Sequence, residues 1–242
     1  MSTGEPVSGW KDELQVAARR LGAAVWAGVL SGALIGGVGG RLAMFVLRLT
    51  SDPSLRGRET DDGFIIGSFT SDTGFLVLVA TAIGMLAGVA YLVLRNLMPE
   101  GRRILIASVI GGVFGGAVII RPDGIDFTEL EPLSLAVVLF ILLPALQGAA
   151  TAYLTERFLD RVQSSDRKNW IVVIVALVPL AVGGIFGLAL LVLALAVWFV
   201  ARRFDLKAVV ERTNLIPIGR RTLAIAVVWF LYTLMMDLAM IA

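Results

Sequence analysis

Six long apolar stretches constrain what this sequence can fold into. A helix needs roughly 20 mainly apolar residues to cross about 30 Å of hydrocarbon. Five of the stretches meet or nearly meet that length, and the sixth carries no charged residue at all. The five are Leu21–Gly40, Phe75–Leu94, Ile104–Ile120, Leu133–Leu154 and Thr222–Ala242, and the sixth is Trp170–Ala201. The sequence therefore predicts an all-α membrane protein, with the lipid bilayer as its immediate partner.

The composition supports this and excludes several kinds of chemistry. Hydrophobic residues make up 57% of the chain and charged residues 17%, whereas a soluble domain has about half and about a quarter. Without any Cys or His, the chain cannot form thiolate nucleophiles, Ser–His triads or the usual Cys and His zinc sites. The net charge is only +2, and no basic stretch with interleaved aromatic residues predicts nucleic-acid binding. No cofactor and no metal are expected.

Basic residues in the short loops predict the orientation of the chain, because cytoplasmic loops carry an excess of Lys and Arg. Residues 1–20 are expected to form a cytoplasmic tail with a short interfacial helix, not a cleavable signal peptide. The loops from Asp52 to Asp72 and from Arg121 to Glu131 are acidic and are expected outside. The residues assigned to the cytoplasm include Lys11, Arg19, Arg20, Arg95, Arg102, Arg103, Arg157, Arg161, Arg167 and Lys168. The pattern predicts a multi-pass plasma-membrane protein with a cytoplasmic N-terminus.

The stretch Trp170–Ala201 allows two interpretations. A single crossing would place the basic segment 202–221 outside, against the charge rule. A short or re-entrant hairpin would return that segment to the cytoplasm, and Pro179 with the Gly-Gly pair after it offers a place to break. We therefore favour seven transmembrane helices, with six as the alternative. Residues 169–242 would then comprise this hairpin and a last span at 222–242.

Two parts of the sequence resemble each other. The motif Ile35–Gly40 (IGGVGG) is echoed at Ile110–Gly116 (IGGVFGG). Each motif is followed by a loop with an Asp-Gly pair, and each following helix carries Ala-Tyr-Leu near its inner end. These matches predict a parallel internal repeat of two-helix units, residues 21–103 and 104–168, related by an axis along the membrane normal.

Glycines recur every four residues on the predicted spans, which places them on one face of each helix. Burial gives helices no drive to associate in lipid, and small residues allow close backbone contact instead. We expect these glycines to pack helices together, although a pore lined by glycine backbone is an alternative. The packing candidates are Gly28, Gly32, Gly36, Gly40, Gly84, Gly88, Gly111, Gly112, Gly115 and Gly116.

A few polar residues at membrane depth or beside it are candidate functional residues. They are Arg41, Asp62, Asp123, Gln147 and Asp237. Arg41 would act either as an interface anchor paired with a loop carboxylate or as a contact for an anion. Gln147 would bond between helices or line a path, and Asp237 would reach the outer interface or relay protons. The acidic loops match no calcium-binding loop.

Three segments carry a resemblance to a known family. Gly36–Thr50, Gly57–Phe64 (GRETDDGF) and Asp123–Pro132 resemble uncharacterised multi-spanning integral membrane proteins of actinobacteria. The resemblance covers about the first 160 residues. It implies a polytopic fold in a bacterial plasma membrane and provides no catalytic or binding residues.

Three functions fit these observations. The first is a non-enzymatic scaffold or accessory subunit, with a membrane-protein partner or self-association. The second is a small-solute or ion transporter or channel, since transporters share parallel repeats and broken helices. The third is a membrane-embedded enzyme acting on lipid-linked substrates, in which a carboxylate would have to be the base.

Overall fold

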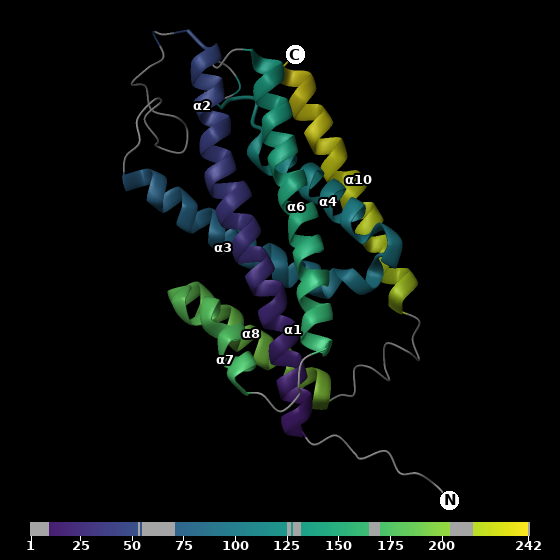
Figure 1. Ribbon diagram of the computed structural model, residues 1–242. Coiled ribbons are helices and arrows are strands. Elements are labelled where there is room, and N and C mark those ends of the chain that lie inside the picture. Colours follow the sequence, from purple (N-terminus) through teal and green to yellow (C-terminus); the bar gives the residue numbers. More distant parts are fainter. Residues whose placement is uncertain are drawn as a thin grey trace, which may run out of the picture.

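The computed structural model describes residues 10–52, 54, 71–124, 127, 132–164, 170–203 and 215–241. Over these ranges the chain is helical and contains no strand (Figure 1). Five of its helices are long and apolar enough to cross a membrane, which confirms the prediction of an all-helical chain with several membrane-capable segments. They are Trp10–Thr50, Gly74–Leu97, Glu100–Ile119, Leu133–Val162 and Leu215–Ile241.

The first of these is one continuous helix of 41 residues. It consists of α1 (Trp10–Ser31), the π-helical segment η1 (Gly32–Gly39) and α2 (Gly40–Thr50). The helix ends where Ser51 turns to an extended backbone and donates its N–H to Leu47 O at 3.0 Å. No break in the helix therefore marks the predicted division between an interfacial helix and a span beginning at Leu21. Helix α1 runs through that boundary because its polar N-terminal part packs against other helices.

The next two helices are joined by a short turn. Helix α3 (Ser71–Leu94) passes through η3 (Arg95–Leu97) and η4 (Glu100–Arg102) into α4 (Arg103–Ile119). Pro99 lies in this turn with an extended backbone, and its ring prevents a continuous helix. Figure 1 shows α3 crossing behind α1 and α6 at a steep angle.

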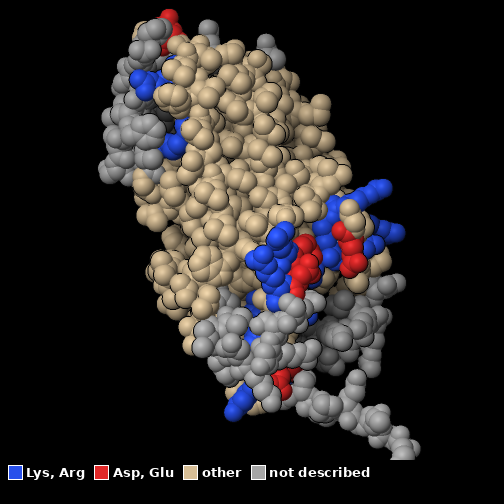
Figure 2. Space-filling model, in the orientation of Figure 1, with Lys and Arg blue, Asp and Glu red and all other residues tan. Residues whose placement is uncertain are grey.

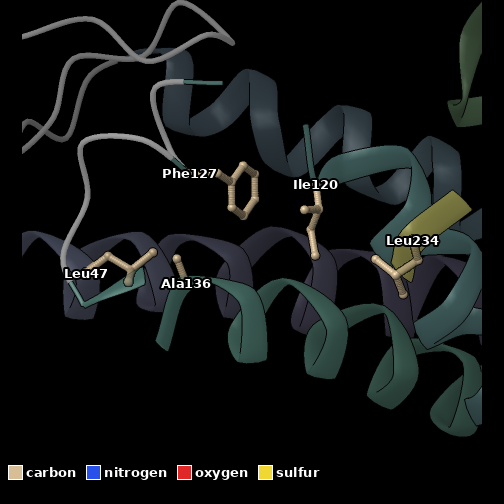
Figure 3. Packing of buried hydrophobic residues seen from close by; sticks show 5 residues of the cluster. All are labelled: Leu47, Ile120, Phe127, Ala136 and Leu234. Carbon is tan, nitrogen blue, oxygen red and sulfur yellow. The ribbon is translucent and has the colours of Figure 1, made fainter. Parts of the chain in front are cut away.

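Helix α6 (Leu133–Ser164) runs the length of the bundle, and α10 (Leu215–Ile241) packs beside α4. The N-terminal part of α6 and the C-terminal part of α10 meet α2 and the end of α4 in an apolar cluster (Figure 3). The buried members of this cluster are Leu47, Ile120, Phe127, Ala136 and Leu234. The cluster joins the helices at the end of the bundle that is uppermost in Figure 1. Next to it the rings of Phe127 and Phe140 meet edge-on, with their centroids 5.3 Å apart.

The charge-free stretch Trp170–Ala201 is broken into two helices. Helix α7 (Trp170–Val182) and α8 (Gly184–Arg203) are joined at Gly183. Gly184 takes φ +58°, a left-handed backbone that favours glycine. Figure 1 shows the hairpin beside the lower end of the bundle, where α1 begins and α6 ends. Its apolar parts, Val173–Val182 and Gly184–Val200, are shorter than the five long helices, so this pair stands apart from them.

The tip of this hairpin is strongly apolar. Val182 and Ile185 flank the turn and are 80% and 79% exposed. Apolar side chains so exposed are disfavoured in water, and lipid would cover them at no cost. Figure 2 shows that uncharged residues form a broad band over the surface of the bundle. Charged residues gather mainly towards its lower end.

Single cysteines test the direction of the hairpin, because the chain contains no native Cys. We expect K11C and R203C to react with an impermeant maleimide from one side of the membrane and D123C from the other. All three positions are exposed. Labelling of R203C from the side of D123C would show that the stretch crosses once and would overturn the hairpin topology.

Candidate functional site

The backbones of α1 and α3 touch where the two helices cross. A Cβ added to Gly28 would overlap Gly84 O, and one added to Gly88 would overlap Ala24 O. A Cβ on Gly32 would overlap Ala80 O and lie 2.9 Å from the Cα of Gly84. Only glycine fits these positions, because the atoms that a side chain would meet are backbone atoms. The crossing depends on small residues in the way that close helix pairs in membranes do.

A second crossing, between α4 and α6, has the same construction. A Cβ on Gly111 would overlap Pro144 O, and one on Gly148 would overlap Ala107 O. Gly115 meets the ring of the same proline. Gly112 and Gly116 make looser contacts, the nearest being the Cβ of Ala145 at 3.1 Å and Ile141 Cγ1 at 3.2 Å.

The contacts place the two crossings in a register that differs from that of the sequence motifs. By their contacts Gly28 and Gly111 are equivalent, because the first meets Gly84 O and the second meets Pro144 O. The sequence motifs instead align Gly111 with Gly36, which lies about two helical turns from Gly28. Gly40 also departs from the expected packing role, since nothing lies within 4 Å of its added Cβ. Gly37 in η1 still packs against Val77 of α3, but Gly40 does not face a neighbouring helix.

Polar side chains connect α1 to α6 at membrane depth. The hydroxyls of Ser31 and Thr151 lie 2.7 Å apart and are both buried. The hydroxyl of Thr151 also donates to Gln147 O at 2.7 Å, and that of Ser31 is 3.2 Å from Gly28 O. Each hydroxyl thus finds an acceptor within the protein, as burial requires. We call Ser31, Gln147 and Thr151 the polar seam.

The π-helix η1 lies beside this seam. Four of its eight residues are glycine. An added Cβ on Gly36 would be 3.0 Å from Gln147 Oε1, so the amide side chain occupies the space that this glycine leaves. At the end of η1 the N–H of Gly40 points to Gly36 O and Gly37 O. Segments of π-helix are rare and occur frequently at functional sites. This seam is therefore the candidate site within the bundle.

A second polar group lies at the basic end of the bundle and was not predicted from the sequence. Glu156 on α6 accepts from Arg95 Nε at 2.9 Å and Nη2 at 2.7 Å. It also accepts from the hydroxyl of Tyr91 at 2.8 Å and pairs with Arg103 Nη1 at 3.3 Å. We call these four residues the Glu156 cluster. The cluster ties α3 and η3 to α4 and α6.

One sequence signal could have indicated this cluster. The Ala-Tyr-Leu motif extends to Ala-Tyr-Leu-x-x-Arg in both places where it occurs, at Tyr91 with Arg95 and at Tyr153 with Arg157. Residues four apart share a helix face. Arg157 Nη1 does bond to the hydroxyl of Tyr153, at 2.9 Å. Around Tyr91 and Arg95, Glu156 lies between the two side chains instead.

The other predicted site residues lie on separate elements. Arg41 is half-buried on α2, Asp123 is exposed in the turn after α4, and Asp237 is half-buried near the end of α10. Asp62 lies outside the described residues. Beyond the end of α2, the N–H of Ser54 donates to Asp52 Oδ1 at 2.7 Å, and this hydrogen bond lowers the pKa of Asp52. Over the described part of the chain, no three acidic residues come close enough to hold a metal ion.

Comparison with known proteins adds no relative. No family model matches the chain, and neither does a curated protein or a solved structure.

Proposed function

We propose that this chain is a non-enzymatic scaffold or accessory subunit of a bacterial plasma membrane. In this proposal its N-terminus is cytoplasmic and the acidic turn containing Asp123 faces outward. It would associate with a membrane-protein partner or with a second copy. The crossing of α1 with α3 and that of α4 with α6 would be two copies of one duplicated two-helix unit. In this alignment Gly28 corresponds to Gly111, because each meets a backbone carbonyl of its partner helix.

The observation that carries the proposal is the hydrogen bonding of the two hydroxyl groups in the polar seam. The hydroxyls of Ser31 and Thr151 bond to each other and to backbone carbonyls. Gln147 fills the space beside Gly36. Hydroxyl groups engaged in this way join helices to one another. The tight carbonyl contacts at both crossings also support a rigid bundle, which suits a structural role more than alternating access.

A small-solute or ion transporter or channel is the second candidate. The π-helix η1 favours it, because π-helical segments frequently accompany function and this one lies against Gln147. A membrane-embedded enzyme has less support. Its site would need Arg41 with several outer carboxylates, and over the described residues no three acidic side chains come together.

Reconstitution distinguishes the first two candidates. We expect proteoliposomes containing the full chain to release protons, K⁺, chloride and small sugars no faster than protein-free vesicles. We also expect the chain extracted in mild detergent to show one fixed stoichiometry, with a partner or with itself, by native mass spectrometry. Solute flux that Q147L or T151V abolishes would overturn the scaffold proposal in favour of a transporter.

A further inference from the structure

Helix α10 packs against the bundle with one of its faces. Phe230 meets Phe114 of α4 edge-on, with the ring centroids 4.8 Å apart, and Leu234 is buried in the apolar cluster of Figure 3. Nearer the start of α10, Arg220 Nε donates to Leu97 O at 2.9 Å, in the turn between α3 and α4. Figure 1 shows α10 at an edge of the bundle. Its opposite face therefore meets whatever surrounds the bundle, and we call it the open face of α10.

Two aromatic rings that carry polar groups lie on this open face. Trp229 and Tyr232 are about one helical turn apart and are 63% and 58% exposed. Their ring centroids are 6.4 Å apart. Within the part of the chain that the structure describes, neither the indole N–H nor the phenol hydroxyl has a hydrogen-bond partner. Exposed apolar residues extend the face in both directions at the three- and four-residue spacing of a helix face, namely Ile225, Val228, Met235, Met236 and Met240.

Both rings lie near the middle of the bilayer. Tyr232 follows Arg221 by 11 residues, which is about 16 Å along a helix and about half of the hydrocarbon thickness. Trp and Tyr usually gather at the two interfaces, where their polar groups reach water. At mid-depth an acyl chain offers no acceptor, and an unsatisfied polar group is costly there. A protein surface that supplies hydrogen bonds therefore suits the open face better than lipid alone.

A second copy of the chain offers the missing partners. The indole N–H of Trp229 can only donate a hydrogen bond, whereas the hydroxyl of Tyr232 can also accept one. Copies inserted in the same orientation would bring their α10 helices together in parallel, around a twofold axis along the membrane normal. Such an axis makes each contact reciprocal, so Trp229 of each copy can donate to Tyr232 of the other. The methionines around this pair adapt readily to a facing surface and contact aromatic rings favourably.

We propose that the open face of α10 joins two copies of this chain into a parallel dimer, with reciprocal hydrogen bonds between Trp229 and Tyr232 at its centre. This inference rests on the proposed association with a partner or a second copy, and it specifies both the surface and the occupant. The glycine crossings lie within each copy and would be unchanged by the dimer.

Disulfide cross-linking in liposomes tests the contact, because the chain has no native Cys. We expect M236C, oxidised with copper phenanthroline at a low ratio of protein to lipid, to form a covalent dimer. L142C on α6 is the matched control, since Leu142 and Met236 are 46% and 47% exposed. The two lie at a similar level, because their neighbours Ile141 and Leu234 both contact Gly116. Equal yields from M236C and L142C, or no dimer from M236C, would overturn the proposal.

Two further variants test the hydrogen bonds. Y232F and W229F keep an aromatic ring and remove the polar group, and both residues are exposed, so each copy should still fold. Energy transfer between labelled copies in liposomes of increasing dilution should show dimerisation about fivefold weaker for Y232F, because a twofold contact loses two interhelical hydrogen bonds. Y153F is the control, since the hydroxyl of Tyr153 already accepts from Arg157 and lies on α6. Equal dimerisation of Y232F and Y153F would show that these bonds do not form.

The outcome also separates this inference from the scaffold proposal. A chain that stays monomeric in liposomes, yet binds a different membrane protein with a fixed stoichiometry, would overturn the dimer and leave the scaffold proposal standing. Dimers cross-linked through M236C that conduct a solute would support the contact of α10 and contradict the scaffold proposal.

Discussion

Replacing Gly84 with alanine should destabilise the bundle more than any other single-methyl change in α3. The new Cβ would overlap Gly28 O and lie 2.7 Å from the Cα of Gly32. Both neighbours are backbone, so α1 and α3 would have to separate. Overpacking of this kind costs about 2 kcal/mol, which corresponds to a fall of roughly 4–8 °C in the unfolding midpoint. Thermal unfolding in nanodiscs measures the change.

Gly74→Ala is the matched control because Gly74 lies on the same helix and has nothing within 4 Å of its added Cβ. Alanine favours a helix over glycine by about 1 kcal/mol. G74A should therefore leave the midpoint unchanged or raise it. If G84A and G74A behave alike, the carbonyl contacts do not hold the crossing together.

Hydropathy predicted the apolar parts of the helices well. The expected span Ile104–Ile120 differs from α4 by one residue at each end, and Phe75–Leu94 ends where α3 ends. Apart from Asp72 near the start of α3 and Arg103 at the start of α4, neither helix contains a charged residue, so the apolar run and the helix nearly coincide. The place of the break after Pro179 was also predicted, because proline and glycine act through local backbone geometry.

The polar extension of α6 was not predicted, and that of α1 was predicted only as a separate interfacial helix. Helix α1 begins at Trp10, and α6 continues to Ser164. In these parts Arg19 and Thr155 are buried against other helices. A local measure of hydropathy assigns such residues to loops, because it contains no information about tertiary packing.

The candidate site was predicted in part and for a similar reason. The glycine spacing marked faces of α1 and α3, but spacing alone does not show at which turn two helices cross. Gly36 therefore meets Gln147, not a helix backbone. Thr151 and its partner Ser31 lie far apart in the sequence. Pairing of this kind becomes visible only with the fold.

Glu156→Gln should be the most damaging change of a charged residue. It preserves the shape of the side chain but leaves two arginines, Arg95 and Arg103, without their shared carboxylate. Breaking a fully buried pair costs about 3–5 kcal/mol, and an exposed pair contributes about 0–1 kcal/mol. The side chain of Glu156 is 26% exposed. We therefore expect a loss of about 1–2 kcal/mol, or roughly 2–8 °C.

The chain provides a matched control in Glu100→Gln. Glu100 also pairs with Arg103 at 3.3 Å, but its side chain is 88% exposed. Water and salt screen such a pair, so E100Q should cost less than about 0.5 kcal/mol. A double-mutant cycle with R95Q isolates the pairwise energy. Coupling near zero between E156Q and R95Q would mean that the Glu156 cluster does not tie α3 to α6.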